Sequence, residues 1–382
     1  LQFTRSRAKD LDKLASDVST LFFGVNISCA QCHDHPLVAD WTQEHFYGMK
    51  SFFARTFENG DFVGEKNYGK LDYKTAKGEA RNASLMFLTG EKLEESEATE
   101  PNEQQKKEEK QQLEELKKNK QAPPAPSYSR RARLVEVALK NPESSFFARA
   151  IVNQVWHRFM GRGLVAPTDQ LHSANAPSHP ELLEWLARDF VRHNYDLKRL
   201  VRGIVLSKAY GRSSVWESAD RPASDLFAVG SIRPLTPFQY GITLRLGSTN
   251  PDQFPADAKP EEVEKRLQGI EGAARGLAGS FEQPGADFQV SIDEALLLTN
   301  GERIERELLR DSGDSLVGRL KTATDINVAL DVAGWTVLGR ALNADESVHV
   351  RQYIEKRADR PVDAWRQVVW AMLTSSECRF NH

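Results

Sequence analysis

The chain has 382 residues, a formal net charge of -3 and 40% hydrophobic residues, including 7 Trp and 19 Phe. This length is enough for two or three domains of about 150 residues each, with a substantial hydrophobic core. The small net charge gives no overall field that would attract nucleic acid or anionic lipid, and no apolar run approaches the ~20 residues of a membrane helix. We therefore expect no nucleic-acid partner and no membrane span.

The cysteine content indicates a specific use of two of the three cysteines. Cys29 and Cys32 lie three positions apart, whereas Cys378 is far away near the end of the chain. A secreted domain stabilised by disulfides is usually shorter and richer in cysteine. The chain opens at Leu1 without a methionine or a signal peptide, and we interpret it as a processed or truncated product.

Residues 1–90 begin with a predicted helix that leads to the cysteine pair. Apolar residues recur at roughly helical spacing over positions 11–22, which predicts a helix with one apolar face. The pair follows in the motif Cys29-Ala30-Gln31-Cys32-His33. Beyond the motif, residues 60–88 are polar with short apolar pieces, which is typical of a loop or of small strands.

The motif Cys-x-x-Cys-His is the attachment signature of a c-type haem. Two thioether bonds to the porphyrin need sulfur atoms about one helical turn apart, and the adjacent histidine can then bind the iron as proximal ligand. We therefore predict one covalent haem c, attached through Cys29 and Cys32 with His33 on the iron.

Three other interpretations of the motif stay open. A zinc site could use Cys29, Cys32, His33 or His35, although no second Cys or His pair follows at a short fixed spacing. A redox-active dithiol normally lies at a strand-to-helix junction of a βαβ unit, and the sequence does not predict one. The two cysteines could also be a buried or disulfide-linked structural pair.

The second axial ligand of the iron does not follow from the sequence. An iron without a sixth protein ligand would suit ligand binding or catalysis better than electron transfer. The candidates for the distal position are Met49, His45, His157 and His179.

An abrupt change of composition separates residues 1–90 from the rest. Residues 91–130 contain a run of Glu, Gln and Lys with almost no apolar side chains, followed by a proline cluster at 123–126. This composition favours a solvated helix or a disordered segment, and we interpret the region as a linker.

Residues 131–382 are predicted to be helical almost throughout. A helix over 146–160 should end at the glycines of Gly161-Arg162-Gly163. The next should start at Ser178, as N-cap, with Pro180 in its first turn. The fold class is therefore mainly α, with a small cytochrome-c-like region at 1–90, a charged insert at 91–130 and a larger all-helical domain at 131–382.

These residues together resemble planctomycete-type exported proteins that join a cytochrome-like domain to a carboxy-terminal domain of unknown function. The resemblance is carried by residues 21–36, 41–53, 141–165, 177–183, 195–198, 207–210 and 370–382. It implies export, and hence a periplasmic, extracellular or cell-surface location. It supports the haem motif but implies no particular biochemical reaction.

The leading functional prediction is electron transfer through one haem c, with a redox partner protein or another cytochrome subunit. One alternative is a haem- or metal-dependent enzyme that acts on an exported substrate such as polysaccharide, although no nucleophile elbow, zinc-protease motif or phosphate loop is present. The other alternative is a structural subunit of a larger assembly. An oligomer is compatible with each of these functions.

Overall fold

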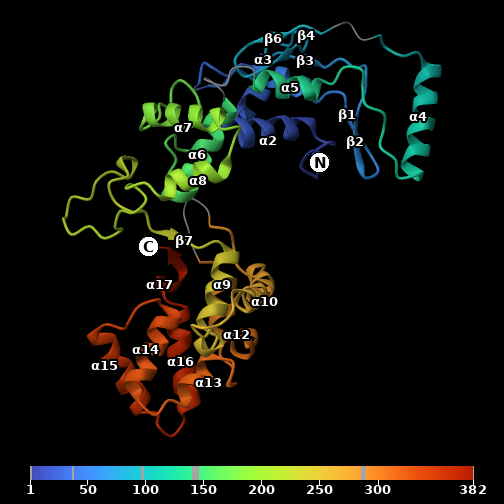
Figure 1. Ribbon diagram of the computed structural model, residues 1–382. Helices are drawn as coiled ribbons and strands as arrows, with labels where there is room; N and C mark the ends of the chain where they lie inside the picture. Colours follow the sequence, from blue (N-terminus) through green and yellow to red (C-terminus); the bar gives the residue numbers. More distant parts are fainter. Residues whose placement is uncertain (1, 37, 96–98, 140–145, 285–289, 382) are drawn as a thin grey trace. The chain divides into compact units, whose positions relative to one another are not determined.

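Residues up to Ser231 and residues from Ile232 onward form two separate units of the computed structural model (Figure 1). The structure describes all residues except 1, 37, 96–98, 140–145, 285–289 and 382. Helices dominate both units and the described strands form only two-stranded antiparallel pairs, so the prediction of a mainly α fold is confirmed. In the described part of the chain, no helix is long and apolar enough to cross a membrane.

The first unit consists of helices with short strand pairs beside them. Its helices are α1 (Gln2–Arg5), α2 (Leu11–Phe23), α3 (Gln43–Ser51), α4 (Glu103–Lys118), α5 (Arg130–Leu139), α6 (Phe146–Met160), α7 (Pro180–Arg192) and α8 (Leu197–Val205), with 3-10 turns η1 (Ser28–Gln31) and η3 (Ser224–Leu226). Its strand pairs are β1 (Thr56–Asn59) with β2 (Phe62–Glu65), β3 (Asp72–Lys74) with β4 (Ala80–Asn82), and β5 (Leu85–Met86) with β6 (Lys92–Leu93).

The second unit is a helical bundle whose ends meet in one short strand pair. Its helices are α9 (Pro237–Gly247), α10 (Pro260–Ala278), α11 (Ile292–Asn300), α12 (Glu302–Glu307), α13 (Leu316–Lys321), α14 (Ile326–Val337), α15 (Ala344–Glu355), α16 (Pro361–Leu373) and α17 (Ser376–Arg379), with the 3-10 turn η4 (Pro251–Gln253). Strand β7 (Arg233–Pro234) pairs with β8 (Phe380–Asn381).

One hydrophobic core joins the parts of the first unit that lie on either side of the charged insert. Buried Phe46 and Met49 precede the insert, buried Trp156 and Leu183 follow it, and all four belong to the same core. Helices α2 and α6 contact each other within this core (Figure 1). The sequence divided the chain at residues 90 and 130, whereas packing divides it after Ser231. The two segments pack as one because each amphipathic helix needs an apolar partner.

The charged insert forms one solvated helix, α4, none of whose residues is buried. The Tyr68 hydroxyl donates a hydrogen bond to Glu109 at 2.6 Å. The Asn59 side chain donates to the Leu113 carbonyl at 3.1 Å, so α4 lies beside β1. Of the two predicted alternatives, a solvated helix or a disordered segment, the structure has the helix.

A buried ion network joins the two ends of the insert. Glu95 binds Arg55 at 2.8 Å and Arg130 at 2.6 Å. The Glu65 carboxylate accepts the backbone N–H of Arg130 at 2.6 Å, at the N-terminus of α5. A carboxylate there interacts favourably with the helix dipole. The insert therefore leaves the core and returns to it at the same ion network.

A short antiparallel pairing connects the segment before the cysteines to the loop after α6. The Asn26 N–H donates to the Asp169 carbonyl, and the Leu171 N–H donates to the Gly24 carbonyl, both at 2.9 Å. The loop is held in turn by the buried Asn153 side chain, which bonds both the N–H and the carbonyl of Val165 at 2.9 Å. The position of the cysteine motif on the core depends on this pairing.

The ends of α6 and α7 follow the sequence prediction in one case and differ from it in the other. Helix α6 ends at Met160 and is followed by Gly161 with φ of 79°, as expected. Helix α7 has His179 as its N-cap, not Ser178. The Ser178 N–H and hydroxyl instead donate to the Leu164 carbonyl at 2.8 and 3.2 Å. Ser178 is therefore used to fix the loop before the helix.

Gly24 should be essential to the stability of this arrangement. It ends α2 with φ of 67°, and an added Cβ would lie 2.5 Å from Leu171 Cδ1. We expect Gly24→Ala to lower the free energy of unfolding by about 2–4 kcal/mol, because it adds left-handed backbone strain to overpacking. Gly78→Ala is the control, since Gly78 has φ of 82° and open space around it, and it should cost only about 1 kcal/mol. If urea unfolding gave the same loss of unfolding free energy for both variants, the packing argument would be contradicted.

Candidate functional site

The cysteine pair lies in a surface turn between α2 and α3. Cys29 is in the 3-10 turn η1, Cys32 follows that turn directly, and both thiols are exposed and free of a disulfide. The two cysteines are three positions apart, which is the length of one turn of a 3-10 helix. Between them, Ala30 is fully buried, as is Ile27 before the turn. The turn therefore presents two thiols to solvent while its apolar side chains hold it on the core.

Polar contacts from the start of α3 hold the turn from the other side. The Asp34 carboxylate accepts the backbone N–H of Gln43 at 2.9 Å. The buried Gln43 side chain donates to the Gln31 carbonyl at 3.2 Å and accepts the Ala76 N–H at 2.8 Å. The side chain of Gln43 thus links the cysteine turn to the segment that joins β3 and β4. No sequence pattern predicted this link, because it joins positions far apart in the chain.

His33 of the motif and His35 just after it differ in the ring nitrogen that carries the proton. Nδ1 of exposed His33 lies 2.7 Å from the Asp34 carbonyl, which can only accept, so Nδ1 carries the proton and Nε2 is free to bind a metal. Nδ1 of His35 accepts the Val38 N–H at 3.1 Å, so the neutral ring of His35 carries its proton on Nε2. The geometry therefore favours His33 as the ligand.

Two of the predicted distal ligands, Met49 and His45, have structural roles in the first unit. Met49 is fully buried in the core of the first unit. His45 is half-buried at the start of α3, and its Nδ1 accepts the Thr42 N–H at 3.3 Å in a capping box. Burial is the main cause that lowers the pKa of His45 below its ordinary value of 6.5. The sulfur of Met49 is therefore enclosed by the core, and Nδ1 of His45 is engaged in the capping box.

The other two distal candidates belong to α6 and α7. His157 is exposed in the last turn of α6. His179 packs against Phe227, with ring centroids 5.7 Å apart, and its Nδ1 lies 3.1 Å from the Ser178 hydroxyl. Within the described part of the chain, no three His, Cys, Asp or Glu side chains are grouped to hold a metal ion. A structural zinc site needs four protein ligands, so the described residues do not form one.

The segment after the motif is also held by the loop that follows α6. The Asp40 carboxylate accepts the Ser173 N–H at 2.8 Å and its hydroxyl at 2.6 Å. The Ser173 hydroxyl is the first cause that lowers the pKa of Asp40. Together with the pairing at residues 24–26, this contact fixes both flanks of the cysteine turn to one loop. Sequence reasoning missed this role of the loop.

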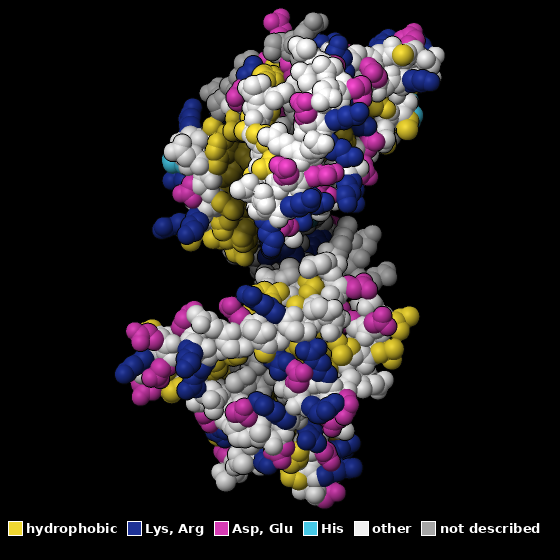
Figure 2. Space-filling model, turned by 90° about the vertical axis from the view of Figure 1, so that its right-hand side faces the viewer, with side chains coloured by type: hydrophobic (Ala, Val, Ile, Leu, Met, Phe, Trp, Pro, Cys, Tyr) yellow, Lys and Arg dark blue, Asp and Glu magenta, His cyan; other side chains and the backbone are white. Residues whose placement is uncertain are grey.

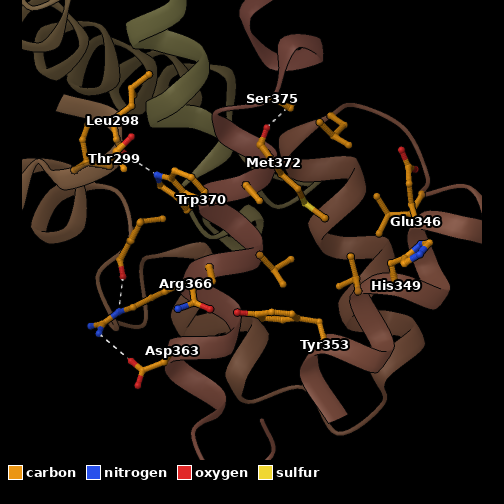
Figure 3. A pocket seen from close by; sticks show the side chains of 18 of the residues that line it. Leu298, Thr299, Glu346, His349, Tyr353, Asp363, Arg366, Trp370, Met372 and Ser375 are labelled. Atoms are coloured by element: carbon orange, nitrogen blue, oxygen red, sulfur yellow. Dashed lines mark hydrogen bonds and ion pairs between the residues drawn. The ribbon is translucent and has the colours of Figure 1, made fainter. Parts of the chain in front are cut away.

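The second unit contains a large open cavity of about 1210 Å³ beside α16. Figure 3 shows side chains from α11, α15 and α16 around it. Its apolar and aromatic lining includes Leu298, Val350, Tyr353, Val368, Trp370 and Met372. Such cavities are common ligand sites when a few polar groups converge in them.

Two carboxylates that line this cavity, Glu346 and Glu377, bind the same arginine. Arg340 forms paired hydrogen bonds with Glu346 at 2.8 and 2.9 Å and with Glu377 at 2.6 and 2.7 Å. The Arg340 guanidinium is the main cause that lowers the pKa of Glu346 to about 2. The indole N–H of Trp370 donates to the Leu298 carbonyl at 2.6 Å (Figure 3). These groups stabilise the surrounding helices and do not define a ligand class.

Comparison with known proteins finds matches to two families, one within the first unit and one that extends a few residues into the second unit. Residues 2–58, which include the cysteine turn, match PSCyt2, described as a protein of unknown function (DUF1549). Residues 130–240 match PSD1, also described as a protein of unknown function (DUF1553). These matches support the planctomycete-type resemblance. No curated protein and no solved structure gives a significant match. Neither family description assigns a cofactor or a reaction.

His45 should make the stability of the first unit depend on pH. Its folded pKa lies below 6.5, so between these two values the unfolded chain binds more protons than the folded one. The free energy of unfolding should therefore fall as the pH is lowered below about 6.5. In His45→Gln the side chain can still complete the capping box but does not titrate. Urea unfolding at pH 7.5 and 5.5 should show a weaker pH dependence in this variant, and an unchanged dependence would contradict the role of His45.

Proposed function

We propose that Cys29 and Cys32 attach one haem c, with His33 as proximal ligand, and that the protein transfers electrons in the periplasm or at the cell surface. The observation that carries this proposal is the pair of exposed thiols three positions apart at a held turn, followed directly by a histidine whose Nδ1 donates to the Asp34 carbonyl. Thioether attachment needs two accessible sulfur atoms about a turn apart and a histidine beside them.

The residues of the chain would orient this group in specific ways. The Asp34 carbonyl fixes the ring of His33 by accepting from Nδ1, an arrangement that is common for metal-binding histidines. The Gln43 side chain and the buried Ala30 limit movement of the turn. Bound haem c supplies a one-electron carrier. Because the thiols lie at the surface, the haem would be accessible to a redox partner protein or another cytochrome subunit.

The attachment is tested with cysteine variants produced in cells that mature c-type cytochromes. We expect the unaltered chain to keep its haem after acid–acetone extraction and Cys29→Ala/Cys32→Ala to lose all of it. Cys378→Ala is the control: burial raises the pKa of this thiol to about 11, so it stays protonated and unreactive. Circular dichroism should show that all chains are folded, since Cys29 and Cys32 are exposed.

Two results would contradict the proposal. One is covalent haem in the double variant, because the attachment would then use other residues. The other is a folded, unaltered chain without covalent haem in a host that matures a control cytochrome. Bound zinc or a Cys29–Cys32 disulfide in that chain would replace the haem interpretation.

The state of the sixth coordination position separates electron transfer from the enzyme alternative. Met49 is buried and Nδ1 of His45 is occupied, which favours an open position or a ligand such as His157 or His179. An open iron should bind carbon monoxide and change its absorption spectrum after reduction, as an enzyme acting through the iron would require. A low-spin spectrum that carbon monoxide does not change would support electron transfer with both axial positions filled.

A further inference from the structure

Helix α8 of the first unit buries some of its apolar side chains and exposes others. Leu200 and Ile204 point into the core and are buried. Leu197, at the start of the helix, is 50% exposed, and Leu206, just after the helix, is 72% exposed. Six residues line a shallow hollow of about 560 Å³, and we call them the α8 surface: Leu197, Lys198, Val201, Arg202, Val205 and Leu206.

The α8 surface consists of two parallel stripes. Leu197, Val201 and Val205 are spaced four apart and form an apolar stripe. Lys198 and Arg202 have the same spacing and form a basic stripe beside it. Residues four apart lie one above the other on a helix. Val201 and Val205 are half-buried, whereas Leu197 and both cations are exposed, so a partly exposed apolar stripe lies beside exposed cations.

The basic stripe is not neutralised by the fold. Helix α8 contains three cations and no acidic residue. Arg199 binds Asp189 at 3.1 Å. In the part of the chain that the structure describes, Lys198 and Arg202 form no ion pair. A local positive field therefore exists on a chain whose formal net charge is -3.

The first unit has further exposed hydrophobic side chains. Val215, Trp216 and Leu226 in the segment after α8 are exposed, and so is Trp185 on α7. Figure 2 shows that hydrophobic side chains gather in a band on the first unit, with Lys and Arg side chains near its edges. Large exposed apolar patches on soluble proteins usually mark a binding surface.

We propose that the α8 surface binds an anionic lipid surface, with the helix lying parallel to the membrane plane. A strongly amphipathic helix with Lys or Arg on its polar edge is typical of interfacial binding. The two unpaired cations complement anionic headgroups, and the apolar stripe would enter the boundary of the acyl chains. A second copy of the chain would fit poorly, because two basic stripes would then meet and repel each other.

The test is sedimentation of the full chain with vesicles. We expect binding to phosphatidylcholine vesicles that contain phosphatidylglycerol to exceed binding to pure phosphatidylcholine by on the order of tenfold, and to weaken with salt. Lys198→Glu/Arg202→Glu should remove this preference. Leu206→Glu should weaken binding to both kinds of vesicle.

Matched controls separate the α8 surface from general effects of charge and hydrophobicity. Lys107→Glu/Lys110→Glu on α4 makes the same change of net charge, and Ile292→Glu on α11 removes an aliphatic side chain that is 79% exposed. Both controls should bind vesicles like the unaltered chain. Thermal unfolding should confirm that every variant is folded.

Three outcomes would overturn the proposal. The first is no binding of the folded chain to anionic vesicles. The second is an equal loss of binding in the α4 control and in Lys198→Glu/Arg202→Glu. The third is a dimer in light scattering that Leu206→Glu dissociates, which would make a second copy the partner of this surface. None of these outcomes depends on whether haem is attached.

Discussion

The backbone pairing of residues 24–26 with residues 169–171 is the constraint on which the rest of the first unit depends. It joins the two segments that match separate families and lies directly before the cysteine turn. The pairing needs Gly24, because a Cβ there would meet Leu171. The Asp40–Ser173 contact fixes the other flank of the turn to the same loop. The position of the candidate haem site is therefore determined by residues more than a hundred positions away.

The charged insert does not interrupt the hydrophobic core, which contains residues from both sides of it. Its helix buries none of its residues, so its formation depends on helix propensity and on a few polar contacts with the first unit. The network of Glu65, Glu95, Arg55 and Arg130 returns the chain to the core with its buried charges paired. A buried carboxylate that lost its partners would be costly. The insert can thus vary in composition while this network is kept.

Local patterns in the sequence predicted much of the fold, and long-range contacts explain what they missed. Gly161 ends α6 as predicted, because a helix end is encoded by its own residues. Ser178 was predicted to cap α7, but its hydroxyl donates to the Leu164 carbonyl, because the packing of the loop brings that carbonyl within reach. The cysteine motif was evident as a pattern, whereas the contacts of Gln43 and the proton position on His33 needed the structure. The net charge of -3 likewise did not predict the basic stripe of α8, because a net charge does not show where the charged residues lie.

The central claim is that this turn carries a covalent haem, and the intact mass of the protein from its natural source tests it most directly. The mass is measured under denaturing conditions, which remove a group that is not covalently bound. We expect the polypeptide mass increased by one haem, localised by fragmentation to the peptide that contains Cys29 and Cys32. A mass of the polypeptide alone, or a mass lower by two hydrogens from a disulfide, would contradict the account.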